Sequence, residues 1–209
     1  MKGKERKLSP AELKRKEAYE RLCQEMEQAG YRKRELTVGL LAANTLSLLL
    51  SLPFAIAISV IYFLANPQSG FQLEQGWLLL FFPVFFLLAA VHEFIHGLTW
   101  SRFCSKGFGS IAFGVIWKAL TPYCSCSEPL TRGQYILGGA MPTLVLGSGL
   151  SIAAIVLAQP FLLVLAVTMI LAGGGDMLII AKLLRYRPEG RGTLYYDHPY
   201  ECGLTAFER

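Results

Sequence analysis

The chain has 209 residues, of which 53% are hydrophobic and only 17% are charged, and its formal net charge is +5. No Asp, Glu, Lys or Arg lies between Glu35 and Glu74, or between Arg132 and Asp176. Uncharged stretches of that length exclude an ordinary soluble domain and exceed the roughly 20 apolar residues that a spanning helix needs. The basic excess therefore points to membrane lipid as a partner and not to nucleic acid.

The first 36 residues form a charged segment with eleven Lys or Arg and seven Glu. The run Ser9-Pro10-Ala11-Glu12 has capping-box spacing with proline at the first helical position, and Gly30 is a natural stop. We predict a helix over 9–29 that lies on the cytoplasmic side, in solvent or on the membrane surface. The segment lacks an apolar stretch ending in a small-residue cleavage site, so we expect no cleavable signal peptide.

The middle of the chain, residues 37–185, is predicted to be a membrane domain of four spanning helices. Their predicted ranges are 38–64, 77–102, 134–158 and 160–182. The loop between the first two carries no Lys or Arg, whereas the central loop and the start of the tail carry several. The positive-inside rule then places both termini and the central loop in the cytoplasm.

The central loop and the tail are expected to add small elements to this bundle. Ile111, Phe113, Val115 and Trp117 recur at period two, which predicts a short strand or one arm of a hairpin that ends near Tyr123. The tail, 186–209, is polar and is expected to pack on the cytoplasmic face. The predicted fold class is an all-α membrane protein with four transmembrane helices, a short cytoplasmic β element and a charged N-terminal helix.

The five cysteines are all predicted on or near the cytoplasmic side, where thiols stay reduced. A disulfide framework is therefore not expected. Cys124 and Cys126 could bind a metal, but two thiols without partners at zinc-site spacing favour reduced, partly buried side chains instead.

The second predicted span contains His92-Glu93-Phe94-Ile95-His96. Residues four apart share one face of a helix, so the imidazoles of His92 and His96 can bind one metal ion. Glu93 lies beside them, where its carboxylate can take a proton from water without being a ligand. Ionisable groups inside a span cost about 2.5–3.5 kcal/mol each on insertion scales. The pattern therefore indicates a catalytic Zn²⁺ site with Glu93 as general base, while hydrogen bonding between helices is the structural alternative.

A catalytic zinc ion usually has three protein ligands and one open position. Asp176 is the best candidate for the third, because it is the only acidic residue in the fourth predicted span. Counting residues from either end of the second and fourth spans places Asp176 at the depth of the histidines. Small residues are expected to let these two helices approach closely: Ala89, Ala90, Gly97 and the glycines at 173–175.

Two residues of the tail compete for a place near this site. Asp197 and His198, in Tyr196-Asp197-His198-Pro199, can fold under the membrane domain. We interpret them as candidates for a structural or supporting role behind the metal ligands. Glu128, in the central loop, is a weaker competitor.

The chain resembles the zincin peptidase family of small bacterial membrane proteins over about residues 75–205. The matching pieces are His92-Glu93-Phe94-Ile95-His96-Gly97, Phe113-Gly114, Glu128-Pro129-Leu130 leading to Tyr135 and Met141-Pro142, Gly175-Asp176, and Asp197-His198-Pro199 before Cys202-Gly203. More distantly, the layout is similar to site-two-type intramembrane metalloproteases, although the chain lacks their Asn-Pro-Asp-Gly context and a PDZ-like domain. The resemblance implies His92, His96 and Asp176 as zinc ligands, Glu93 as base, and a bacterial cytoplasmic membrane location.

These observations predict a zinc-dependent endopeptidase that cleaves a peptide or membrane-protein substrate at or within the membrane, near its cytoplasmic face. The strand at 111–117 is a candidate for holding an extended substrate by strand addition. The alternative is a non-catalytic membrane protein, an assembly or accessory factor, whose zinc or polar site is structural. Glu93 separates the two hypotheses, because a structural site does not need it. The oligomeric state has no signal in the sequence.

Overall fold

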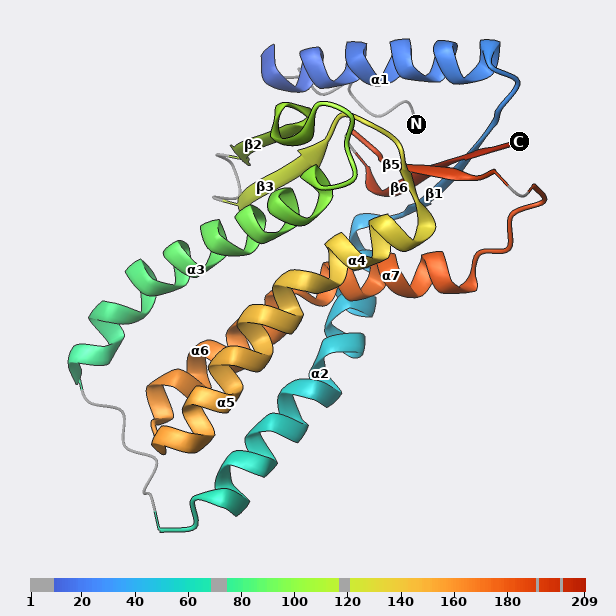
Figure 1. Cartoon of the computed structure of the whole chain (residues 1–209). Helices are drawn as coiled ribbons and strands as arrows, with labels where there is room; N and C mark the ends of the chain where they lie inside the picture. Colours follow the sequence, from blue (N-terminus) through green and yellow to red (C-terminus); the bar gives the residue numbers. More distant parts are fainter. Residues whose placement is uncertain (1–9, 69–74, 117–120, 191, 200) are drawn as a thin grey trace, which may run out of the picture.

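The computed structural model describes residues 10–68, 75–116, 121–190, 192–199 and 201–209. Its first element is helix α1 (Pro10–Gln28), close to the predicted range 9–29. Gly30 ends it with φ of +84°, a left-handed conformation that glycine adopts without steric cost. Figure 1 shows α1 lying across the small strands at one end of the molecule, away from the long helices.

The long helices form the body of the fold (Figure 1). They are α2 (Leu40–Ala65), α3 (Gln75–Ser101), α4 (Arg132–Pro142), α5 (Ser148–Leu157), α6 (Pro160–Ala172) and α7 (Gly174–Arg185). Within the described part of the chain, three helical stretches are long and apolar enough to cross a membrane, or four if the bent pair α6 and α7 is one span. Many of their Leu and Phe side chains point outward and are exposed, as expected for helices surrounded by lipid.

Two of the predicted spans are not regular helices. The third passes through a π-helical turn, η2 (Thr143–Gly147), between α4 and α5. The fourth, predicted as one helix over 160–182, is two helices that meet at Gly173 with a 40° bend. A Cβ at Gly173 would lie 2.4 Å from Thr143 Oγ1, so only glycine lets the chain bend this close to η2.

The prediction of an all-α protein with one short β element is wrong in its β content. A four-stranded antiparallel sheet has the order β1-β6-β5-β4. Its strands are β1 (Arg32–Val38), β4 (Leu130–Thr131), β5 (Leu194–Asp197) and β6 (Cys202–Glu208). The charged N-terminal segment and the polar tail therefore pair with each other, from Arg32 opposite Glu208 to Val38 opposite Cys202.

The predicted strand in the central loop is confirmed as one arm of a hairpin. Strand β2 (Ile111–Ile116) pairs with β3 (Thr121–Cys126), and a 3-10 turn, η1 (Gly107–Ser110), leads into it. Trp117, the last residue of the predicted strand, lies outside the described residues. The hairpin packs on the C-terminal part of α3, where a Cβ at Gly97 would lie 2.5 Å from the Phe113 ring.

A buried cluster joins the sheet to the ends of the helices. It includes Trp100 of α3, Tyr135 of α4, Leu183 of α7, and Tyr195 and Leu204 of the sheet. Each of these side chains is at most 5% exposed. Burial of apolar surface stabilises a fold by about 25 cal/mol per Å². This cluster therefore helps to fix the relative positions of α3, α4 and α7 near the polar residues described next.

Candidate metal centre

His92 and His96 project from one face of α3, as their spacing predicts. Their exposed fractions are only 8% and 4%, and their ring centroids are 4.9 Å apart. Asp176 reaches them from the first turn of α7: its Oδ2 lies 3.0 Å from His92 Nε2, and its Oδ1 lies 3.4 Å from His96 Nε2. The structure thus brings together the three residues proposed as ligands.

These three side chains could hold a metal ion, because one ligand atom from each lies within 4.8 Å of the others. Two imidazoles and a carboxylate form a donor set that suits Zn²⁺ with one position left for water. Each carboxylate oxygen faces a different imidazole, so the acid is shared and not paired with one ring. The residues present therefore fit a zinc ion.

The orientation of His96 is fixed from the side opposite Asp176. Its Nδ1 lies 2.8 Å from the carbonyl oxygen of Gly138 in α4, so Nδ1–H donates and Nε2 faces Asp176. The Trp100 ring stacks on the imidazole at 4.9 Å and 12°. A Cβ at Gly138 would lie 1.9 Å from Trp100 Nε1, so the missing side chain lets the indole and the backbone both reach His96.

Glu93 faces the same centre. It lines a cavity of about 160 Å³ together with His96, Asp176 and Asp197. Cys124, in β3, lines the same cavity. The hairpin therefore forms one wall of the cavity that Glu93 shares with two of the three candidate ligands, His96 and Asp176.

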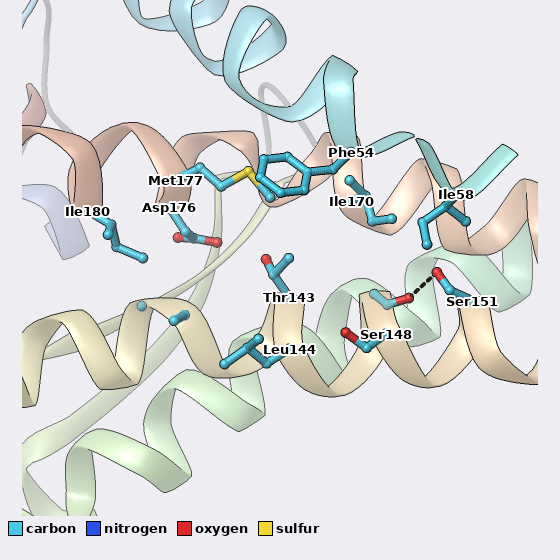
Figure 2. Close-up of a pocket in the computed structure, with 13 residues that line it drawn as sticks. Phe54, Ile58, Thr143, Leu144, Ser148, Ser151, Ile170, Asp176, Met177 and Ile180 are labelled. Atoms are coloured by element: carbon cyan, nitrogen blue, oxygen red, sulfur yellow. Dashed lines mark hydrogen bonds between the residues drawn. The ribbon is translucent and has the colours of Figure 1, made fainter. Parts of the chain in front are cut away.

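Two larger cavities adjoin this one. The first, about 390 Å³, lies between α3 and the hairpin and shares Glu93 with it. The second, about 370 Å³, is lined mainly by apolar residues of α2, α4 to α7 and η2, and shares Gly139, Asp176 and Ile180 with it. Figure 2 shows Asp176 at the edge of this second cavity, with Phe54 of α2 and Leu144 of η2 on its walls. Phe54 and Leu144 are 58% and 57% exposed, so the cavity lies at the outer surface of the helices.

The two tail residues considered in the sequence are placed differently. Asp197 lines the cavity with His96 and Asp176, and the Tyr135 hydroxyl donates to its Oδ1. Burial raises the pKa of Asp197, while this hydrogen bond acts in the opposite direction. Asp197 therefore lies beside the candidate ligands, where it can influence their charge without binding the metal.

His198 is not in the group of candidate ligands found among the described residues. Its ring centroid lies 5.4 Å from that of Tyr19 in α1, and its Nδ1 accepts a hydrogen bond of 3.0 Å from the Glu201 N–H. The Tyr19 hydroxyl in turn lies 2.8 Å from Thr205 Oγ1 of β6. These contacts place His198 where α1 packs on the sheet; a role behind the metal ligands stays a prediction.

Glu128 and the cysteines are also outside that group. Glu128 accepts hydrogen bonds from Ser110 and from the backbone N–H groups of Ser105 and Lys106, and these bonds lower its pKa to about 2. It therefore fixes the turn after α3. The five cysteines are free thiols, and Cys104 Sγ lies 3.1 Å from Cys126 Sγ.

The prediction that small residues let α3 and α7 pack closely against each other is wrong. Gly97 packs against the hairpin, and a Cβ at Gly174 would lie 2.6 Å from the Ser47 carbonyl oxygen of α2. Gly97 therefore lets α3 approach the hairpin, and Gly174 lets α7 approach α2. Three supporting residues had no role predicted from the sequence: Gly138, Trp100 and Tyr135, which act through a backbone carbonyl, a ring face and a hydroxyl. Tyr135 entered only as part of the family resemblance, and Trp100 follows His96 by four residues on the same helix face.

Comparison with known proteins gives one match. A family model described as putative zincin peptidase matches residues 84–190, slightly more than half of the chain. The matched range begins in α3 before the histidines and ends after α7, so it contains all three candidate ligands and Glu93. No curated protein and no solved structure matches the chain.

Proposed function

Because this chain belongs to the zincin peptidase family, we propose that it is a zinc-dependent endopeptidase that cleaves peptide bonds at or within the membrane near its cytoplasmic face. The observation that carries this proposal is the position of Glu93. Its carboxylate borders the same small cavity as His96 and Asp176. A zinc site that only links two helices needs no further carboxylate next to the histidines on α3, so the geometry favours catalysis over a structural metal.

The roles follow from the chemistry of each group. His92, His96 and Asp176 would hold the ion, and zinc in such a site acts as a Lewis acid that polarises a peptide carbonyl and acidifies water. Glu93 would take the proton from the attacking water and return it to the departing amine. Cys124 of the hairpin lines the same cavity as Glu93, and the packing of β3 on α3 limits the motion of the Glu93 side chain before proton transfer.

The sheet supports four membrane crossings with both termini on one side. Strand β1 precedes α2, β4 follows α3 and β5 follows α7, and all three belong to the same sheet. A chain that returns to that side after each pair of crossings fits this sheet, and this favours α6 and α7 as one bent span. Lys106, Arg132 and Arg185 lie at this end of the helices, so the positive-inside rule assigns it to the cytoplasm. The family resemblance suggests a bacterial cytoplasmic membrane.

The hairpin is the proposed platform for an extended polypeptide substrate. Among the described residues, β2 pairs only with β3, so its other edge has backbone groups that a substrate strand can pair with. The cavity beside it is lined by Phe94, Phe113, Val115 and Tyr123 and reaches Glu93. An apolar side chain next to the scissile bond fits this lining, since burying it there removes apolar surface from water.

The test is the Glu93→Gln variant of the full-length protein in membranes. The amide keeps the size of the side chain but cannot accept a proton, so we expect proteolysis to fall by the 10²–10⁴-fold typical of lost general-base catalysis. Zinc content, measured by mass spectrometry of the metal, should stay at the wild-type level, because Glu93 is not a ligand.

A matched control is Glu201→Gln, which removes a carboxylate from an exposed position on the tail. We expect this variant to keep both zinc and proteolysis. Undiminished proteolysis in Glu93→Gln would refute Glu93 as the general base and would favour the alternative in which the metal site is structural.

A further inference from the structure

Pro142 lies in the last turn of α4, four residues after Gly138. In a regular α-helix, the N–H of residue 142 would donate to the carbonyl of residue 138. Proline has no N–H, and its ring also pushes the carbonyl four residues earlier away from the helix axis. The Gly138 carbonyl therefore has no regular donor within its own helix.

The next amide does not replace the missing one. The N–H of Thr143 donates to the Ala140 carbonyl, and the chain then enters the π-helical turn η2. Pro142 is fully buried, so water does not supply a donor through this face of the helix. An unpaired buried carbonyl is destabilising, which makes a side-chain donor at this position strongly favourable.

His96 is that donor: its Nδ1 lies 2.8 Å from the Gly138 oxygen. We propose that Pro142 is a positioning residue of the metal centre, which acts by leaving the Gly138 carbonyl free to bind His96. The helix break, the Gly138 carbonyl and the His96 imidazole thus connect α4 to the candidate metal centre. The proposal rests on the proposed function insofar as it takes His96 to be a zinc ligand.

The consequence is chemical as well as geometric. A neutral imidazole has one donor and one acceptor nitrogen, and the partner of one nitrogen decides the state of the other. With Nδ1–H donated to Gly138, Nε2 carries the lone pair on the side of Asp176, where it would be available to a zinc ion held with that carboxylate. Ligand orientation by such outer contacts is typically worth 10–100-fold in metal affinity.

Pro142→Ala supplies the missing N–H and lets the helix close around Gly138. We expect this variant to bind zinc 10–100-fold more weakly, measured by competition with a chromophoric chelator on purified protein in detergent. In the zinc-loaded wild type, the His96 Nδ1 proton should give a slowly exchanging signal in ¹⁵N-edited NMR, and this signal should be lost or exchange rapidly in Pro142→Ala.

Two further variants separate the missing N–H from the shape of the proline ring. Replacing Pro142 with the α-hydroxy acid counterpart of alanine removes the ring but still supplies no N–H, so zinc affinity should stay close to wild type. Pro83→Ala removes an exposed proline from the interior of α3, the helix that carries the histidines, and should leave affinity unchanged. If Pro142→Ala does not fold, the zinc affinity of the hydroxy-acid variant alone tests the proposal.

Wild-type zinc affinity in Pro142→Ala, with the His96 Nδ1 signal retained, would overturn the proposal. So would a weakened affinity in the hydroxy-acid variant, because the ring and not the absent N–H would then be responsible. Neither readout requires turnover. If the wild-type protein has no peptidase activity but the variants show the expected zinc affinities, the positioning role stands and the peptidase proposal is refuted. If the wild type is an active peptidase but Pro142→Ala keeps wild-type zinc affinity, the peptidase proposal stands and the positioning role is refuted.

Discussion

Asp176 shows how a carboxylate can be stable among the membrane helices. Its oxygens face two imidazoles, at 3.0 and 3.4 Å, and its side chain stays 27% exposed toward the adjoining cavities. A lone ionised group in hydrocarbon is costly, but one paired with donors or a cation is not. The cluster as a whole therefore explains why three polar side chains occur at this depth.

A prediction at the residue scale concerns Tyr135, whose hydroxyl donates to the Asp197 carboxylate in the lining of the cavity beside the candidate ligands. Tyr135 is only 5% exposed, so its removal leaves Asp197 without this donor in a buried place. Tyr135→Phe should lower the free energy of unfolding by about 1–3 kcal/mol, measured by denaturant unfolding in detergent.

The matched control is Tyr62→Phe. The Tyr62 hydroxyl is buried and has no hydrogen-bond partner among the described residues, so its loss should be neutral or stabilising. Equal effects of the two substitutions would show that the Tyr135 contact contributes nothing specific.

At the residue scale, the sequence predicts the candidate metal ligands but not the residues that orient them. His92, His96 and Asp176 stand out because ionisable groups are rare in apolar spans, and helical periodicity gives their relative depth. Gly138 gives no such signal, because it acts through a backbone carbonyl that every residue has. Asp197 and His198 are adjacent in the sequence, yet only Asp197 lines the cavity beside the candidate ligands. Asp197 is the last residue of β5, and the chain leaves the strand at His198.

At the scale of elements, α7 carries Asp176 and is positioned by its contact with α2. A Cβ at Gly174 would lie 2.6 Å from the Ser47 backbone carbonyl, which cannot move as a side chain can. Gly174→Ala should push α7 away from α2, lower stability by about 1–3 kcal/mol and weaken zinc binding, because Asp176 follows two residues later.

The neighbouring Gly175 provides the control. A Cβ there meets nothing within 4 Å, so Gly175→Ala should raise stability by about 0.5–1 kcal/mol through lower chain entropy and keep zinc affinity. Thermal unfolding and chelator competition on both variants measure the difference. Zinc affinity that is equal in the two variants would contradict the positioning of α7 by α2.

The elements that the sequence did not predict are those that depend on distant partners. The long apolar helices are evident from composition, and the hairpin strand from its period-two pattern. Strand β1, by contrast, begins with Arg32-Lys33-Arg34-Glu35 and has no apolar run; it becomes a strand because β6 pairs with it from the other end of the chain. The break at Gly173 likewise reflects the packing of η2 and not a proline.

At the scale of the whole molecule, the sheet predicts a definite topology. In a cysteine-free background, Gln68→Cys in the first loop should react with a membrane-impermeant maleimide on intact cells. Glu189→Cys in the tail should react only after the membrane is opened, because the proposed topology assigns the sheet and the basic residues to the cytoplasmic side. The reverse labelling pattern, or labelling of both sites in intact cells, would contradict the four-span arrangement.

The most direct test of the account is zinc K-edge X-ray absorption of the purified, zinc-loaded protein. Ligation by His92, His96, Asp176 and a water predicts nitrogen and oxygen neighbours at about 2.0–2.2 Å, with two imidazole rings visible in the outer shells. Sulfur neighbours at about 2.3 Å would instead assign the ion to the cysteines near the hairpin and contradict the proposed metal centre.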